Sequence, residues 1–335
     1  MPCLRQLLTP LVLLAASALI AQSCPPRLVN VEVLDDHNLP VAGLTPANFK
    51  ASHDRQPLNV LSATFRAEPA VRTVVLLSEM APPQIARPAV LEFISTAPPQ
   101  APISMFTFST GIERRFNSSE GRQPMKDWLV QGEGQSSRKG FSGLAQVLLT
   151  IIKAMEPAHT GDAIYVVTGN ADPSFFELGN KLSPPMMTDL ANELRSSGIR
   201  LFVLVLEVIP HRAWDVIQPD NNLITAPYVP KGPPALADLV RVSGGLSLNW
   251  YPGTKSVSFG PSFEYNDRMR AAIHESSRAF QSAISNFYQL TVDSVGLSPA
   301  PEDWNLEVVD SQGKKLKKVT LAYPSKIGGC SAAAR

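Results

Sequence analysis

The stretch Thr73-Val-Val-Leu-Leu77 is a continuous apolar run between Arg72 and Glu79. An unbroken run of this kind is typical of a strand that is covered on both faces. Comparable runs follow at residues 103–108, 162–168 and 199–206, and segments with helical spacing separate them. This alternation predicts an α/β fold with a doubly wound, mostly parallel sheet.

Working outward from this stretch, helical spacing of apolar residues predicts five helices. We expect them at residues 84–96, 141–155, 187–196, 235–242 and 266–287. Ser142 is the expected N-cap of the second helix, and Gly198 is the expected end of the third. Residues 111–116 are expected to pair with 103–108 at the sheet edge, and 246–250 to add a last short strand.

Both ends of the chain have the pattern of strands. Val29, Val31 and Val33 alternate with polar residues, and Tyr288 to Val292 alternates in the same way. Residues 306–309 and 316–323 read as a hairpin around a turn. Neither end has enough strands for a stable sheet of its own. We therefore expect residues 24–70 to pair with residues 288–335 in a small β-sandwich, with residues 71–287 inserted between them.

Residues 1–23 have the features of a secretory signal peptide. Arg5 precedes an apolar run from Leu7 to Ala21, and small residues follow at the expected cleavage site. The run is too short to span a bilayer, and no later segment has the required length and apolar character. The mature protein is therefore expected to be periplasmic, secreted or part of the cell envelope.

Two cysteines remain after the signal peptide, Cys24 and Cys330. An oxidising compartment permits a disulfide between them. Lipidation of Cys24 is an alternative because it follows the cleavage site directly, although Ala21-Gln22-Ser23 is a poor lipidation signal. Free thiols are the third possibility.

Composition and motifs exclude several classes of protein. With 30 basic and 29 acidic residues, the net charge is +1, and the sequence lacks the excess of basic residues that is typical of proteins that bind nucleic acid. The sequence has no zinc-protease, phosphate-binding or dinucleotide-binding motif, and Gly140-Phe-Ser-Gly143 lacks the second glycine of a nucleophile elbow. The five histidines have no metal-ligand spacing. We therefore expect a protein that is not an enzyme.

Three segments, in their order along the chain, resemble a known family. They are Val33-Leu-Asp-Asp-His-Asn-Leu-Pro-Val-Ala-Gly-Leu-Thr-Pro-Ala-Asn-Phe49, Leu190-Ala-Asn-Glu-Leu-Arg-Ser-Ser-Gly-Ile199 and Leu239-Val-Arg-Val-Ser-Gly-Gly245. The chain resembles the VWFA-related proteins of the Acidobacterial type, which contain a von Willebrand factor A domain. The resemblance implies a Rossmann-like sheet and a protein-interaction or adhesion function.

The resemblance also implies a magnesium site that this sequence has largely lost. Such domains bind Mg²⁺ through Asp-x-Ser-x-Ser after the first strand, a Thr on a second loop and an Asp after a central strand. Here Ser78, Met80 and Pro82 stand in the first motif, Ser142 replaces the Thr, and Gly169 replaces the last Asp. We expect a degenerate site with no cofactor; an altered Mg²⁺ site that uses Glu79, Asn170 or Asp172 is the alternative.

A proline-rich stretch at residues 209–234 carries two aromatic residues, Trp214 and Tyr228, that would suit an interface. We therefore expect an unknown protein or envelope ligand to bind at the carboxyl edge of the sheet without a metal. Metal-dependent adhesion and a purely structural envelope scaffold are the alternatives. The expected rim residues are Ser78, Glu79, Ser142, Asn170, Asp172, Trp214 and Tyr228.

Overall fold

The computed structural model describes residues 25–329, except 38, 68–70, 80, 82, 110, 132–142, 160, 170–183, 207–233, 251–266 and 295–296. Its central sheet has six strands in the order β10-β9-β8-β5-β6-β7. The strands are β5 Thr73–Ser78, β6 Ile103–Phe108, β7 Ile112–Phe116, β8 Ala163–Gly169, β9 Arg200–Leu206 and β10 Ser247–Trp250. All neighbours are parallel except β6 and β7, so the predicted parallel sheet with an antiparallel edge pair is confirmed.

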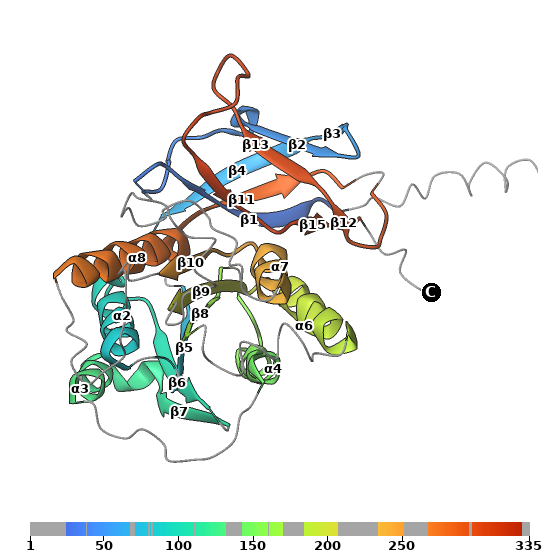
Figure 1. The fold of residues 1–335 in the computed structure, drawn as a ribbon. Helices are drawn as coiled ribbons and strands as arrows, with labels where there is room; N and C mark the ends of the chain where they lie inside the picture. The colour runs from blue at the N-terminus through green and yellow to red at the C-terminus, as the bar shows by residue number, and fades with distance from the viewer. Residues whose placement is uncertain are drawn as a thin grey trace, which may run out of the picture.

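Helices cover both faces of this sheet (Figure 1). They are α2 Pro83–Thr96, α3 Gln123–Gln131, α4 Leu144–Ala154, α6 Pro184–Ser197, α7 Pro234–Ser243 and α8 Asp267–Ser285. Val75 and Leu77 of β5 pack with α2, α3 and α8, whereas Val74 and Leu76 pack with α4, α6 and α7. Successive side chains of a strand point to opposite faces, so one apolar run supplies both cores. The doubly wound architecture is confirmed.

Three local predictions differ from the structure. Helix α3 was not expected, because only Met125 and Leu129 of its nine residues are buried and the apolar periodicity is weak. Helix α4 begins at Leu144 with Gly143 as its N-cap, so the prediction of Ser142 as the cap is wrong. Helix α8 ends at Ser285, and Phe287 belongs to strand β11, which follows without a loop.

The strands near the two ends of the chain pair with one another. One sheet has the order β14-β1-β11-β4 and a second has the order β13-β2-β3. A third sheet pairs β12 with β15. These strands are β1 Arg27–Leu34, β2 Phe49–His53, β3 Gln56–Leu58, β4 Val60–Ala67, β11 Asn286–Val292, β12 Glu302–Asp303, β13 Asn305–Val308, β14 Thr320–Ala322 and β15 Lys326–Ile327.

The two larger sheets share one apolar cluster. Val31 of β1, Phe49 of β2 and Leu306 of β13 belong to it, together with Tyr288 of β11. The Tyr288 hydroxyl donates to Val41 O at 3.0 Å and accepts from Leu44 N at 2.9 Å, which satisfies its polar end inside the cluster. These contacts tie residues from both ends of the chain into one core.

The predicted hairpin of residues 306–309 with 316–323 is only partly formed. An isolated bridge joins Val309 to Lys315, but β14 then pairs with β1 rather than with β13. Strand β1 has eight residues and β13 has four, so β1 is the longer extended partner. Glu32, Val33 and Leu34 of β1 lie opposite Ala322, Leu321 and Thr320. Strand β14 is therefore an edge strand of the four-stranded sheet.

The terminal strands contact the amino ends of the parallel strands. Glu32 of β1 bonds to Arg200, the first residue of β9. Ser325, which follows β14, donates to Arg241 O near the end of α7. The carboxyl ends of β5 and β6 lie about one strand length, about 20 Å, from their amino ends. Among the described residues, no helix combines the length and apolar character needed to cross a bilayer.

Candidate active surface at the carboxyl edge of the sheet

Strands β5 and β6 end side by side, and this fixes the first two residues of the predicted rim. Ser78, the last residue of β5, lies opposite Phe108, and the Glu79 N–H donates to Phe108 O at 3.0 Å. Ser78 is buried, whereas Glu79 begins the loop that leads to α2. Both predicted residues therefore lie at the carboxyl edge, where ligand sites of open α/β sheets gather.

Arg115 holds the Glu79 carboxylate. Its Nη2 lies 3.0 Å from Glu79 Oε1, while Ser109 Oγ donates to Glu79 Oε2 at 3.0 Å. Arg115 Nε also donates to Thr107 Oγ1 at 3.1 Å, and Nη1 lies 2.8 Å from Glu113. Both Glu79 oxygens thus have partners, and the Arg115 guanidinium lies between the carboxylates of Glu79 and Glu113.

A β-bulge explains how Arg115 reaches this position. Met105 pairs with Phe116 and Phe106 pairs with Arg114, so Arg115 has no partner in the β6–β7 ladder. An extra residue of this kind re-aims its side chain and is common beside binding sites. The bulge therefore directs a basic side chain of the edge strand over the end of the sheet.

A small pocket opens beside this network, between β5, β6, α2 and α3. Its lining residues are Leu77, Ser78, Glu79, Ala81, Pro83, Ala86, Arg87, Thr107 and Trp128. The Arg87 guanidinium carbon lies 4.8 Å from the centre of the Trp128 ring, and that of Arg115 lies 5.4 Å from it. Trp128 is the aromatic wall of the pocket and is itself only half-buried.

Arg87 carries a charge that no described acidic side chain pairs with directly. Only 9% of the residue is exposed, and its Nη1 is buried without a hydrogen-bond partner among the described residues. Burial lowers the pKa of Arg87, and the neighbouring Arg115 lowers it further, while Glu79 acts in the opposite direction. The pocket therefore has a positive character on the α2 side.

The described residues do not fit a divalent cation. They include no group of three or more His, Cys, Asp or Glu side chains that could share a metal. The one carboxylate of the pocket, Glu79, is bonded to Arg115 and Ser109. Strand β8 ends at Gly169, which offers no carboxylate at the position where the family has Asp. A guanidinium beside the pocket would repel Mg²⁺.

Of the predicted site residues, the structure brings Ser78 and Glu79 together. The other predicted site residues lie outside the described residues: Ser142, Asn170, Asp172, Trp214 and Tyr228. Met80, Pro82, Cys24 and Cys330 also lie outside them. The structure adds three residues that the sequence did not single out, namely Arg87, Arg115 and Trp128.

One signal in the sequence pointed to Arg87. It is a basic residue on the apolar face of the predicted helix 84–96, between Ile85 and Val90. A long charged side chain on such a face lies either at the edge of the core or in a site. Arg115 and Trp128 gave no such signal, since their positions depend on a bulge and on the unexpected helix α3.

No protein-family model and no curated protein matches the chain. Among solved structures, an aerotolerance-related membrane protein from Bacteroides fragilis is similar at 13% identity, covering 64% of this chain and 98% of that one, with a TM-score of 0.40. A von Willebrand factor type A protein from Catenulispora acidiphila has 10% identity, coverages of 92% and 74%, and a TM-score of 0.41. The conserved hypothetical protein BatB from Bacteroides thetaiotaomicron has 12% identity, coverages of 62% and 98%, and a TM-score of 0.35.

Because all three TM-scores lie below 0.5, these likenesses add no argument about the site. The strand order, the antiparallel edge strand β7 and the helices on both faces are those of a von Willebrand factor A-like fold. The fold expected from the sequence resemblance is therefore present.

Proposed function

We propose that this chain is an exported, non-enzymatic module of the Acidobacterial VWFA-related type that binds a protein or cell-envelope ligand without a metal. The binding surface is the carboxyl edge of the central sheet around Ser78, Glu79, Arg87 and Trp128. From here on, the rim means these four described residues, of which Ser78 and Glu79 were predicted from the sequence.

One observation carries this proposal: basic side chains stand at the edge where a von Willebrand factor A domain coordinates its ion. The Glu79 carboxylate is neutralised by Arg115, and Arg87 adds a buried positive charge. Hard oxygen ligands are what Mg²⁺ requires, and a guanidinium cannot serve as one. The half-buried Trp128 ring suits a protein partner, since aromatic side chains dominate the centres of interfaces.

The terminal strands support the same assignment by their position. We propose that residues 24–70 and 288–335 form a small β-sandwich that holds the α/β part, residues 71–287, by its amino edge. The Glu32–Arg200 contact and the Ser325–Arg241 contact both lie on that side. The opposite edge is left for a ligand, and Ser142, Asn170, Asp172, Trp214 and Tyr228 are proposed to extend the rim there.

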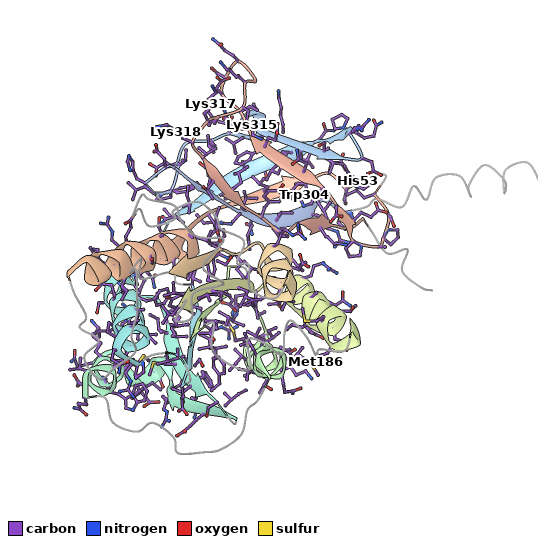
Figure 2. The ribbon with its side chains drawn as sticks, in the orientation of Figure 1. His53, Met186, Trp304, Lys315, Lys317 and Lys318 are labelled. Carbon is purple, nitrogen blue, oxygen red and sulfur yellow. The ribbon has the colours of Figure 1, made fainter. Side chains whose placement is uncertain are left out.

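Selection of binding peptides tests the proposal. A random peptide display library is selected on the immobilised mature protein in a buffer that contains Mg²⁺. The recovered peptides are then measured against the wild type and against Glu79→Lys, which reverses a charge at the rim. The matched control is Asp36→Lys, because Asp36 pairs with Lys318 at the far end of the terminal strands (Figure 2).

The proposal expects peptides that bind the wild type and the Asp36→Lys variant equally and whose dissociation constant for the Glu79→Lys variant differs at least about tenfold, a change of about 1.4 kcal/mol. Thermal unfolding of both variants is measured to check that they remain folded. Peptides that bind equally to all three proteins would place the ligand site elsewhere and refute the proposal.

A further inference from the structure

We propose that the rim pocket binds a single carboxylate of its partner directly through Arg87, where a metal-binding relative would use an ion. This inference rests on the proposed function, because it names the chemistry that the same surface recognises. Four features of the pocket support it.

The first feature is the unused hydrogen-bonding capacity of Arg87. The side chain is nine-tenths buried, and its Nη1 has no hydrogen-bond partner among the described residues. A guanidinium has five N–H donors in a planar fork that matches the geometry of a carboxylate. Buried charged groups normally have hydrogen-bond partners, so an anion beside Nη1 would supply the acceptor that this atom lacks.

The second feature is the charge balance around the pocket. Arg115 is paired with Glu79 at 3.0 Å and with Glu113 at 2.8 Å, so its charge is already compensated. Both Glu79 oxygens accept bonds from other side chains, and Glu79 acts on Arg87 only as a nearby charge. The charges of Arg87, Arg115, Glu79 and Glu113 sum to zero, so a ligand carboxylate would be held by direct hydrogen bonds from Arg87 rather than by an excess of positive charge. A phosphate dianion would bring two negative charges beside Glu79 and is therefore less favoured.

The third feature is the N-terminal end of helix α2. The helix begins at Pro83, and Pro83, Ala86 and Arg87 of its first turns line the pocket. The N–H groups of a first helical turn have no partner within the helix, and the helix dipole favours a negative charge there. This end of the helix adds to the attraction that Arg87 exerts.

The fourth feature is the Trp128 ring, which holds Arg87 in place. The ring centre lies 4.8 Å from the guanidinium carbon, and the Trp128 and Phe116 rings contact each other in a T-shaped arrangement with 6.3 Å between centroids. Stacking on an aromatic face leaves the edge of a guanidinium for in-plane hydrogen bonds. The arrangement therefore orients the donors of Arg87 before a ligand arrives.

Nuclear magnetic resonance on the full mature protein in EDTA tests the inference. N-acetyl-glutamate N-methylamide is the probe, and N-acetyl-glutamine N-methylamide is its neutral isostere. The signals followed are the Arg87 Nε–H and the Trp128 indole N–H. We expect the glutamate probe to shift both signals saturably, and to bind at least about tenfold more tightly than the glutamine probe.

Two variants locate the effect. Arg87→Gln is expected to abolish the shift of the Trp128 signal on addition of the glutamate probe. Arg87→Lys is expected to give a shift smaller than that of the wild type. The control is Arg195→Gln, since Arg195 also has a buried nitrogen without a partner but lies on α6, on the other face of the sheet. The comparison of the two probes on the wild type needs no variant, so it decides the question even if Arg87→Gln does not fold.

Equal shifts from the two probes, or no shift from either, would overturn the inference. Tighter binding of inorganic phosphate than of the glutamate probe would also overturn it, in favour of a phosphate ligand. If display peptides depend on Glu79 but show no preference for acidic residues, the proposed function stands and the carboxylate inference fails. If no display peptide depends on the rim, the proposed function itself fails.

Discussion

Arg200 Nη1 donates a hydrogen bond to Glu32 Oε1 at 2.6 Å, although the two residues are 168 positions apart and only 1% of each side chain is exposed. The same guanidinium donates to the carbonyls of Gly161, Ala283 and Ile284 at 2.9, 3.0 and 2.8 Å. Two of these carbonyls belong to the last turn of α8, where backbone acceptors lack partners within the helix. Arg200 therefore joins β1, β9 and the end of α8.

Replacing Arg200 by Met is expected to lower the free energy of unfolding by about 3–5 kcal/mol, because it leaves the buried carboxyl group of Glu32 and several backbone carbonyls without their donor. Arg241→Gln is the control, since Arg241 pairs with Asp238 on the surface, where such pairs contribute about 0–1 kcal/mol. Urea denaturation followed by circular dichroism measures both variants. Equal, small losses for the two would show that the Arg200 contacts do not hold the terminal strands.

Glu32 makes the stability depend on pH. Burial raises its pKa to about 8 from the ordinary value of 4.5, against the opposing effect of Arg200. The folded state thus holds a proton that the unfolded state releases above pH 4.5. The stabilisation is complete below that pH and is lost as the pH rises through about 8.

Glu32→Gln cannot titrate, so it isolates this effect. Between pH 5 and pH 9, the wild type is expected to lose a few kcal/mol relative to Glu32→Gln, at about 1.4 kcal/mol for each unit of pKa difference. Urea denaturation across this range measures both proteins. Parallel stability curves for the two would mean that Glu32 stays ionised in the folded protein.

Gly245 is expected to tolerate no side chain. A Cβ atom there would lie 2.0 Å from the carbonyl oxygen of Leu201, which is backbone and has little freedom to move. We expect Gly245→Ala to destabilise the protein by about 3 kcal/mol or more. At Gly111 a Cβ would meet nothing within 4 Å, so Gly111→Ala serves as the control. Thermal unfolding that shows similar melting temperatures for both variants would contradict this packing.

A disulfide between Cys24 and Cys330 remains a prediction, and one contact between their neighbours supports it. Arg27 Nε donates to Gly328 O at 3.0 Å, and Arg27 Nη2 donates to Gly329 O. Both thiols of the exported protein are expected to react with an alkylating reagent only after reduction, as mass spectrometry would show. Cys24→Ser and Cys330→Ser should each cost about 2–5 kcal/mol. Alkylation without reduction, or a lipid on Cys24, would refute the disulfide.

The sequence predicted the central sheet well because its strands are buried on both faces. Runs such as 73–77 and 199–206 have no polar face, so they could be identified as buried strands of a mostly parallel sheet from the sequence alone. Gly198, with a φ of +67°, ends α6 as expected, because glycine adopts this conformation without strain. These features depend on local composition, which a sequence displays directly.

The rim was harder to predict because its residues meet only in three dimensions. Glu79 and Arg115 are 36 positions apart and depend on the bulge in β7. Trp128 lies on α3, a short helix with two buried residues and a weak pattern. The sequence therefore predicted that Ser78 and Glu79 lie at the carboxyl edge of the sheet. It did not predict that Arg87 and Arg115 make the pocket basic.

The most direct test of the central proposal, a ligand site that needs no metal, is the dissociation constant of a rim-dependent peptide before and after removal of divalent ions. Peptides selected in Mg²⁺ are titrated calorimetrically into the protein in Mg²⁺ and again in EDTA. The constant is expected to agree within about twofold between the two conditions, a difference of less than about 0.5 kcal/mol. Loss of binding in EDTA that Mg²⁺ or Mn²⁺ restores would contradict the proposal.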